Sequence, residues 1–372
     1  MRVLLLSADI GEGHDLPARS IRDGILAQAP GTEVVIRDTL ALAGPVVRAA
    51  VRAGAETILG RAGPLFDLQY LLAGRWGPSR WLASRLLTAI AGPRLRAEIE
   101  RCGADVVVCT YPLANEALCE LRARGRLSVP VVSAITDLAA LRYWAHPACD
   151  LHLTIHPESD AEIRAIAGPG ARIEPVRGMT SAAFDQPVDA GAARASLGLD
   201  PVAPIVVVSG GGWGIGDLAG AAGAAVEAGA DVHVVVLCGR SADVARRLEA
   251  ELGDHPRVTT MGFTDRMSDL LAAGDVLVHS TAGLTVFEAL VRGMRVISYG
   301  WGVAHIRLNN RAYRRFGLAE VVEDRAGLRG AIRRALDAPR VPDASYGLRP
   351  TAAGLVLEAG DGARRAEHGP AA

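Results

Sequence analysis

A histidine and an aspartate occupy positions in the first half of the chain that suit acid–base chemistry. His14 follows the short apolar run of residues 3–6, in a loop that glycines keep open, and nearby Asp9 suits an orienting partner for a general base. Asp137 follows the apolar run of residues 129–136 and is a second candidate carboxylate. Both side chains also have simpler explanations, because a histidine at a helix start can cap or pack and aspartate is a frequent helix cap.

The second half of the chain carries a pattern typical of a phosphate site. The apolar run of residues 275–279 ends in small residues, and a helix is expected to start near Thr285. The small residues before this helix, which include Gly283, would let a phosphate approach the backbone up to Leu284, and the new helix dipole favours an anion. Glu288, one turn into that helix, could accept hydrogen bonds from a sugar hydroxyl. The simpler interpretation is an ordinary strand-to-helix turn with a surface glutamate.

Another glycine-rich turn follows the apolar run of residues 205–208. Five glycines within seven residues remove side chains where the chain must turn. The pattern resembles a dinucleotide-binding fingerprint, but the spacing is not G-x-G-x-x-G and no persuasive ribose-binding acid follows a second strand, so a dinucleotide site is poorly supported. A later turn that includes Phe263 could present its backbone to the edge of a flat base. The glycines are Gly210, Gly211, Gly212, Gly214 and Gly216.

The elements that must position these residues alternate as strand, helix and strand. This order predicts an α/β fold with parallel, doubly wound sheets, in which active sites lie at the carboxyl ends of the strands. A helix is expected over residues 17–29, after the His14 loop. The rhythm restarts at residue 205, so we predict domains at 1–180 and 201–338, with a linker near 178–200. Residues 339–372 form a tail, part of which we expect to pack back on the first domain, with the end disordered from about residue 360.

Residues 44–96 differ in character from the rest of the first domain. Tryptophans and many aliphatic residues alternate there with eight arginines, against two acidic residues. Such a composition is typical of a helix lying on an anionic membrane surface. An ordinary amphipathic helix pair covering the sheet is the alternative.

Composition narrows the possible functions. The net charge of −1 gives no general attraction to nucleic acid, and the chain contains no lysine, which excludes a Walker A loop and lysine Schiff-base chemistry. The five cysteines include no C-x-x-C pair, which fits a reduced, cytoplasmic protein. Neither a signal peptide nor an apolar run long enough to span a membrane is evident, so we expect a soluble or peripheral protein.

Five motifs in order resemble the monogalactosyldiacylglycerol synthase family, which includes bacterial processive diacylglycerol glucosyltransferases and is more distantly related to MurG. The resemblance covers roughly residues 1–335 and implies a GT-B glycosyltransferase, with two Rossmann-like domains facing a cleft. The motifs are Asp9-Ile10-Gly11-Glu12-Gly13-His14, Ile135-Thr136-Asp137-Leu138, the glycine loop 210–216, Gly262-Phe263, and Gly283-Leu284-Thr285-Val286-Phe287-Glu288-Ala289.

The resemblance implies a role for each motif. His14 is implicated in acceptor activation. Phe263 is expected near the uracil of the donor nucleotide, and Glu288 is expected to bind its ribose. His305 and Asn309 are at the positions where relatives bind the donor sugar, although Ile306 replaces an acidic residue there. In the first motif, Glu12 replaces a glycine. On the acceptor side we place Gly11, Gly13 and Tyr111, together with Trp144 and His146, which follow Asp137 and could line an acceptor pocket.

The implied activity is transfer of a hexose from a nucleotide diphosphate sugar, expected to be a UDP-sugar, to a lipid hydroxyl such as that of diacylglycerol. No metal or other cofactor is expected, and His14 is favoured over Asp137 as the base. The partners would be the nucleotide sugar, the lipid and an anionic membrane, at the inner face of the cell membrane. Alternatives are a polyprenyl-linked or soluble natural-product acceptor, a UDP-sugar 2-epimerase, or a non-catalytic nucleotide-sugar-binding module.

Overall fold

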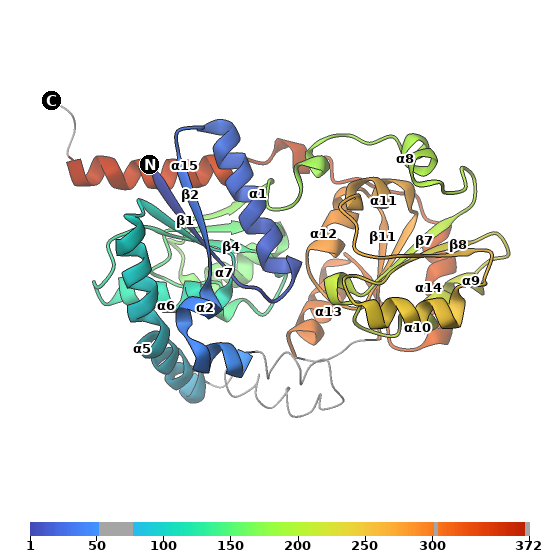
Figure 1. Ribbon diagram of the computed structural model, residues 1–372, viewed down its shortest axis with the longest axis horizontal. Helices are drawn as coiled ribbons and strands as arrows, with labels where there is room; N and C mark the ends of the chain where they lie inside the picture. Colours follow the sequence, from blue (N-terminus) through green and yellow to red (C-terminus); the bar gives the residue numbers. More distant parts are fainter. Residues whose placement is uncertain (52–76, 301–303, 369–372) are drawn as a thin grey trace. The chain divides into compact units, whose positions relative to one another are not determined.

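The computed structural model describes residues 1–51, 77–300 and 304–368 (Figure 1). The chain divides into two compact units. The first contains residues 1–181 and 347–372, with the short stretch 303–305, and the second contains residues 182–302 and 306–346. Each unit is described by itself. Part of the membrane-contact segment predicted from the sequence, residues 52–76, lies outside the described residues.

The first unit is built on a six-stranded parallel sheet in the order β2-β1-β3-β4-β5-β6. Its central strands are continuous apolar runs that are buried on both faces, as expected for a parallel sheet. The strands are β1 (Arg2–Ser7), β2 (Glu33–Asp38), β3 (Val106–Cys109), β4 (Val131–Ile135), β5 (Leu151–Thr154) and β6 (Ile173–Pro175). The helices are α1 (Glu12–Gln28), α2 (Thr39–Ala43), α5 (Gly77–Cys102), α6 (Pro112–Ala123), α7 (Asp160–Ala167) and α15 (Ala352–His368).

The second unit contains another six-stranded parallel sheet, in the order β12-β11-β10-β7-β8-β9. The helix α9 packs on α14, and α11 packs on α8. The strands are β7 (Ile205–Ser209), β8 (His233–Leu237), β9 (Val258–Met261), β10 (Val276–His279), β11 (Arg295–Tyr299) and β12 (Glu320–Val322). The helices are α8 (Ala190–Leu197), α9 (Leu218–Val226), α10 (Ala242–Leu252), α11 (Met267–Ala273), α12 (Leu284–Val291), α13 (Ala304–Phe316) and α14 (Arg325–Leu336). The prediction of two doubly wound parallel sheets is therefore confirmed.

Two details of the sequence analysis differ from the structure. The helix α1 begins at Glu12 rather than near residue 17, so His14 lies in its first turn and not in an open loop. The tail does not become disordered at residue 360, because α15 continues to His368 and packs beside α1 in the first unit (Figure 1). The small residues Gly24 of α1 and Ala353 of α15 allow this close approach.

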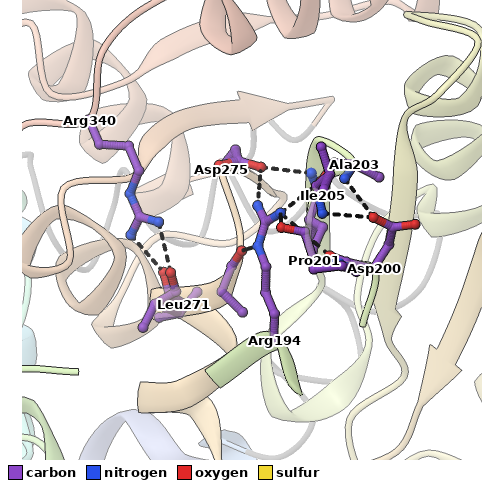
Figure 2. Close-up of polar contacts among 11 residues, drawn as sticks. Arg194, Asp200, Pro201, Ala203, Ile205, Leu271, Asp275 and Arg340 are labelled. Carbon is purple, nitrogen blue, oxygen red and sulfur yellow. Dashed lines mark hydrogen bonds and ion pairs between the residues drawn. The ribbon is translucent and has the colours of Figure 1, made fainter. Parts of the chain in front are cut away.

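Buried arginines fasten the start of the second unit to its sheet. Figure 2 shows Arg194 of α8 donating to the carbonyls of Pro201 and Ala203 and to the carboxylate of Asp275. Arg194 also donates to the carbonyl of Ala273 at the end of α11. The same carboxylate accepts the backbone N–H of Ile205, the first residue of β7, at 2.8 Å. The guanidinium group supplies five donors in a fixed fork, which suits it to several carbonyl oxygens at once.

In the part of the chain that the structure describes, no helix is both long enough and apolar enough to cross a membrane.

Replacing Arg194 with methionine leaves Asp275 and several carbonyls without their buried donor. We expect Arg194→Met to lower the free energy of unfolding of the second unit by about 3 kcal/mol. Urea denaturation, with hydrogen exchange at β7 to assign the transition to this unit, would measure the change. The control is Arg246→Met, which removes an exposed pair with Asp243 and should change stability by less than about 0.5 kcal/mol. Equal effects of the two substitutions would contradict the anchoring role.

Candidate active site

Each sheet has one position at which the order of its strands reverses. In the first sheet this position lies between β1 and β3, and in the second it lies between β7 and β10. Ligands of open parallel sheets bind outside the carboxyl ends of the strands at such a point. His14 and Tyr111 follow β1 and β3, and the two glycine-containing turns follow β7 and β10. His14, Tyr111 and the two glycine-containing turns therefore fall at the place that each topology favours.

The ring of His14 is held by a backbone carbonyl. Its Nδ1 lies 2.8 Å from the carbonyl oxygen of Thr110, immediately after β3. Because a carbonyl oxygen only accepts, Nδ1 must carry the proton, and in the neutral ring Nε2 is then the basic nitrogen. We expected Asp9 to orient this histidine, whereas the partner of Nδ1 is the Thr110 carbonyl. The ring is thus oriented as a general base needs to be.

Two aromatic rings surround His14. Tyr111 meets it edge-on at 5.0 Å between ring centroids, and Trp144 lies at 6.1 Å in a tilted arrangement. Burial, together with the nearby charge of Asp38, raises the pKa of the Tyr111 hydroxyl, so this group stays protonated. The preceding glycines, Gly11 and Gly13, form the turn into α1 and its first residues.

Asp137 joins this cluster through Trp144. The strand β4 ends two residues before Asp137, and the indole N–H of Trp144 donates to Asp137 Oδ2 at 2.8 Å. Trp144 is only 1% exposed, so it supports the carboxylate from inside the core and does not line an open acceptor pocket as we expected. The structure thus brings His14, Asp137, Tyr111 and Trp144 together within the first unit.

His146 does not belong to this group. Its Nδ1 accepts the backbone N–H of Ala148, and its Nε2 lies 3.7 Å from the carboxylate of Glu120, near the end of α6. The prediction that His146 lines the acceptor pocket is therefore not supported by its position. Glu12, which replaces a glycine in the first motif, pairs with Arg19 on the next turns of α1.

In the second unit, the glycine loop is folded tightly onto the ends of the neighbouring strands. The N–H of Ile215 bonds back to the carbonyl of Gly210, and a Cβ on Gly210 would overlap both backbone groups of Ile215. Gly214 has a φ of 62°, and a Cβ there would lie 2.6 Å from the carbonyl oxygen of Cys238, after β8. Only glycine satisfies these positions, so the loop presents bare backbone at the edge of the sheet.

The turn after β10 is attached to this loop. The hydroxyl of Ser280 donates to the carbonyl of Ile215, and Gly283 caps the start of α12. His279, at the end of β10, accepts the N–H of Thr281, and burial lowers its pKa to about 3, so it is neutral. Leu284, Thr285 and Glu288 follow in α12, where Glu288 is buried. The two turns that the sequence assigns to phosphate binding thus share one edge of the second sheet.

Phe263 and Arg240 form a stacked pair beside the glycine loop. Phe263, after β9, is 46% exposed, and the guanidinium carbon of Arg240 lies 3.5 Å from the centre of its ring. The backbone N–H of Arg240 donates to the carbonyl of Gly212 at 2.8 Å, which fixes the stacked pair to the glycine loop. Sequence reasoning assigned no role to Arg240, although a basic residue that follows a strand end was a usable signal.

Two residues predicted to hold the donor sugar lie on α13. The side chain of Asn309 is completely buried, and its contact with a donor sugar stays a prediction. His305 lies in the first turn of α13, and its side chain is outside the described part.

Two six-stranded parallel sheets with flanking helices, each with polar groups at its reversal point, form the GT-B architecture of glycosyltransferases. One solved structure of this fold is SsfS6, a glycosyltransferase of Streptomyces sp. SF2575, complexed with thymidine diphosphate. It is 17% identical, with a TM-score of 0.57, over 96% of this chain and 99% of that one. The fold predicted from the sequence is confirmed.

The resemblance to the monogalactosyldiacylglycerol synthase family is also confirmed, since the model for Monogalactosyldiacylglycerol (MGDG) synthase matches residues 14–176. The chain is 23% identical over 201 residues to the processive diacylglycerol beta-glucosyltransferase of Staphylococcus carnosus (strain TM300), covering 52% of this chain and 49% of that protein. It is 26% identical over 316 residues to a probable chloroplastic monogalactosyldiacylglycerol synthase of Glycine max, covering 80% and 58%. The chain spans about half the length of the first of these relatives.

A methyl group on Gly210 would have to displace the backbone of Ile215. We therefore expect Gly210→Ala to destabilise the second unit by about 2 kcal/mol, as overpacking of a rigid site does. Thermal unfolding would measure this change. The matched control is Gly262→Ala, because a Cβ at Gly262 meets nothing within 4 Å. Similar unfolding temperatures for both variants would show that the loop is not as tightly packed as the structure indicates.

Proposed function

We propose that this chain is a glycosyltransferase that moves a hexose from a nucleoside diphosphate sugar to a hydroxyl of a lipid of the diacylglycerol class. The observation that carries the proposal is His14, whose Nδ1–H is fixed on the Thr110 carbonyl at the reversal point of the first sheet. This arrangement leaves Nε2 as the base that an alcohol acceptor requires. The lipid class is taken from the relatives, whose names include diacylglycerol as the sugar acceptor.

The second unit is proposed to bind the donor. The diphosphate would meet backbone N–H groups of the glycine loop and of the first turn of α12, where the helix dipole favours negative charge. Phe263 with Arg240 offers a flat surface for a nucleobase, for which we propose uracil, and Glu288 offers a carboxylate for the ribose. The neighbour SsfS6 was crystallised with thymidine diphosphate, which supports a nucleoside diphosphate in this position.

The proposed reaction is a single displacement. His14 Nε2 takes the proton of the acceptor hydroxyl while its oxygen forms a bond to the anomeric carbon of the sugar. The bond from that carbon to the diphosphate breaks, and the nucleoside diphosphate leaves with the electron pair. The N–H groups around it stabilise the growing charge, so we propose that the reaction needs no metal ion and no other cofactor.

The helix α5 is proposed to hold the enzyme on the inner face of the cell membrane. Four large apolar side chains of α5 are between 41% and 58% exposed, and Arg85 stacks over one of them at 4.8 Å. Apolar residues beside arginine are typical of a helix lying in an anionic membrane surface. The four are Trp81, Leu82, Leu86 and Ile90.

The proposed activity is tested with UDP-glucose and UDP-galactose and vesicles that contain diacylglycerol, with mass spectrometry of the lipid products. We expect His14→Ala to lower kcat by about a hundredfold or more, because it removes the general base. The control is His233→Ala. His233 begins β8, at the amino ends of the strands of the second sheet, so this variant should retain activity within about twofold. Full activity of the His14→Ala protein would contradict the base assignment. Formation of an epimerised nucleotide sugar without lipid would favour the epimerase instead.

Membrane attachment is tested by sedimentation with phosphatidylglycerol vesicles. We expect the double variant Trp81→Ala, Leu86→Ala to bind about tenfold more weakly or worse, because it removes much of the exposed apolar surface of α5. The control is Leu348→Ala, since Leu348 is 87% exposed but lies far along the chain from α5. Equal binding of both proteins would argue against this surface.

A further inference from the structure

We infer that Trp144 is a positioning residue for the transfer reaction, and that it acts by holding the carboxylate of Asp137 in one orientation within the cluster that contains His14. The inference rests on the proposed function, because it assigns to Asp137 a part in binding or activating the acceptor hydroxyl. It differs from the role expected from the sequence, in which Trp144 itself lines the acceptor pocket.

The first support is the hydrogen bond between the two side chains. An indole has a single N–H and no acceptor, and Trp144 uses that N–H on Asp137 Oδ2 at 2.8 Å. Trp144 is among the largest fully buried side chains, whereas Asp137 is only partly buried. The buried ring therefore gives the partly buried carboxylate of Asp137 a fixed hydrogen-bond donor.

The second support is the way in which Trp144 itself is held. Its carbonyl oxygen accepts two buried hydrogen bonds at 2.8 Å, from Asn115 of α6 and from Ser133 of β4. Asn115 is completely buried, and its own side-chain oxygen accepts the thiols of Cys119 and Cys149. Trp144 is therefore fixed to both a helix and a strand of the first unit.

The third support is the backbone between the two residues. Within the described ranges, Ala140 is the sole residue other than glycine with a positive φ, at 69°. This conformation costs an alanine roughly 1–2 kcal/mol. It lies in the turn that separates Asp137 from Trp144, where the chain folds back so that the indole reaches the carboxylate. The strain is thus located in the segment that forms this contact.

The fourth support is the contact with His14. The rings of Trp144 and His14 lie 6.1 Å apart, so one buried side chain touches both polar groups of the cluster. With Oδ2 engaged by the indole, Oδ1 becomes the oxygen that meets the acceptor. Fixing that atom aligns the hydroxyl with the base, and misplacement of about 1 Å can cost a hundredfold in rate.

A double-mutant cycle on kcat tests the inference. We expect Trp144→Phe, which keeps a ring but loses the N–H, to lower kcat by about tenfold or more. The KM for the nucleotide sugar should stay within about twofold, because this donor binds to the second unit. In an Asp137→Ala background the same substitution should lower kcat by less than about twofold, since its partner is already absent. Equal losses in both backgrounds would overturn the inference, because a merely structural tryptophan acts independently of Asp137.

Two further variants separate positioning from loss of packing. Ser133→Ala removes a hydrogen bond to the Trp144 carbonyl but keeps the indole N–H, so we expect a smaller loss of kcat than for Trp144→Phe. Thermal unfolding of both variants shows whether each is folded. A Ser133→Ala protein that loses as much activity as Trp144→Phe would attribute the effect to packing and overturn the inference.

The bond itself is tested without any activity, by NMR of protein labelled with ¹⁵N at its five tryptophan indoles. The signal that disappears in Trp144→Phe is that of Trp144. We expect it to move upfield and to exchange faster with water in Asp137→Ala, and an unchanged signal would overturn the inference. A wild-type protein that transfers no sugar would instead refute the proposed function, while the NMR result would still decide whether Trp144 holds Asp137.

Discussion

The arrangement at the second sheet depends on backbone packing that leaves no room for side chains. Gly210 lies against Ile215, and Gly214 lies against the carbonyl of Cys238. Because these contacts are between main-chain atoms, the loop cannot relax by turning a side chain away. Ser280 then ties the next turn to the same loop. The position of the α12 N-terminus relative to the loop therefore follows from glycine packing, and the proposed diphosphate site follows from that position.

The two sheets use different means to present chemistry at similar places. In the first unit, buried side chains and one carbonyl orient His14 and Asp137, so the reactive groups are side chains fixed by the core. In the second unit, side chains are removed and the backbone itself is presented. This division suits the proposed reaction, because a proton acceptor must be a titratable group, whereas a diphosphate is best met by many weak N–H donors.

The sequence predicted the strands well, because buried parallel strands are short continuous apolar runs, and it placed the two glycine-containing turns correctly at strand ends. It could not predict the partner of His14, because that partner is the backbone carbonyl of Thr110, a group that every residue carries. It also could not show that Trp144 points into the core while His146 turns to Glu120, because both follow Asp137 in the same short segment. The sequence correctly indicated that part of the tail packs on the first domain, but its glycines wrongly suggested disorder from residue 360, where α15 continues and packs against α1 and β3.

The anchors of the second unit are arginines, and each uses its guanidinium group on backbone carbonyls. Arg194 and Arg340 donate to carbonyls at the end of α11. Burial lowers the pKa of Arg340, but a guanidinium group starts from a higher pKa than a lysine ammonium, so alkaline solution should affect these anchors less than it would affect lysines in their place. All basic residues of this kind in the sequence are arginines, so the chain contains no lysine amine. Amine-directed reagents therefore find no lysine side chain in this sequence.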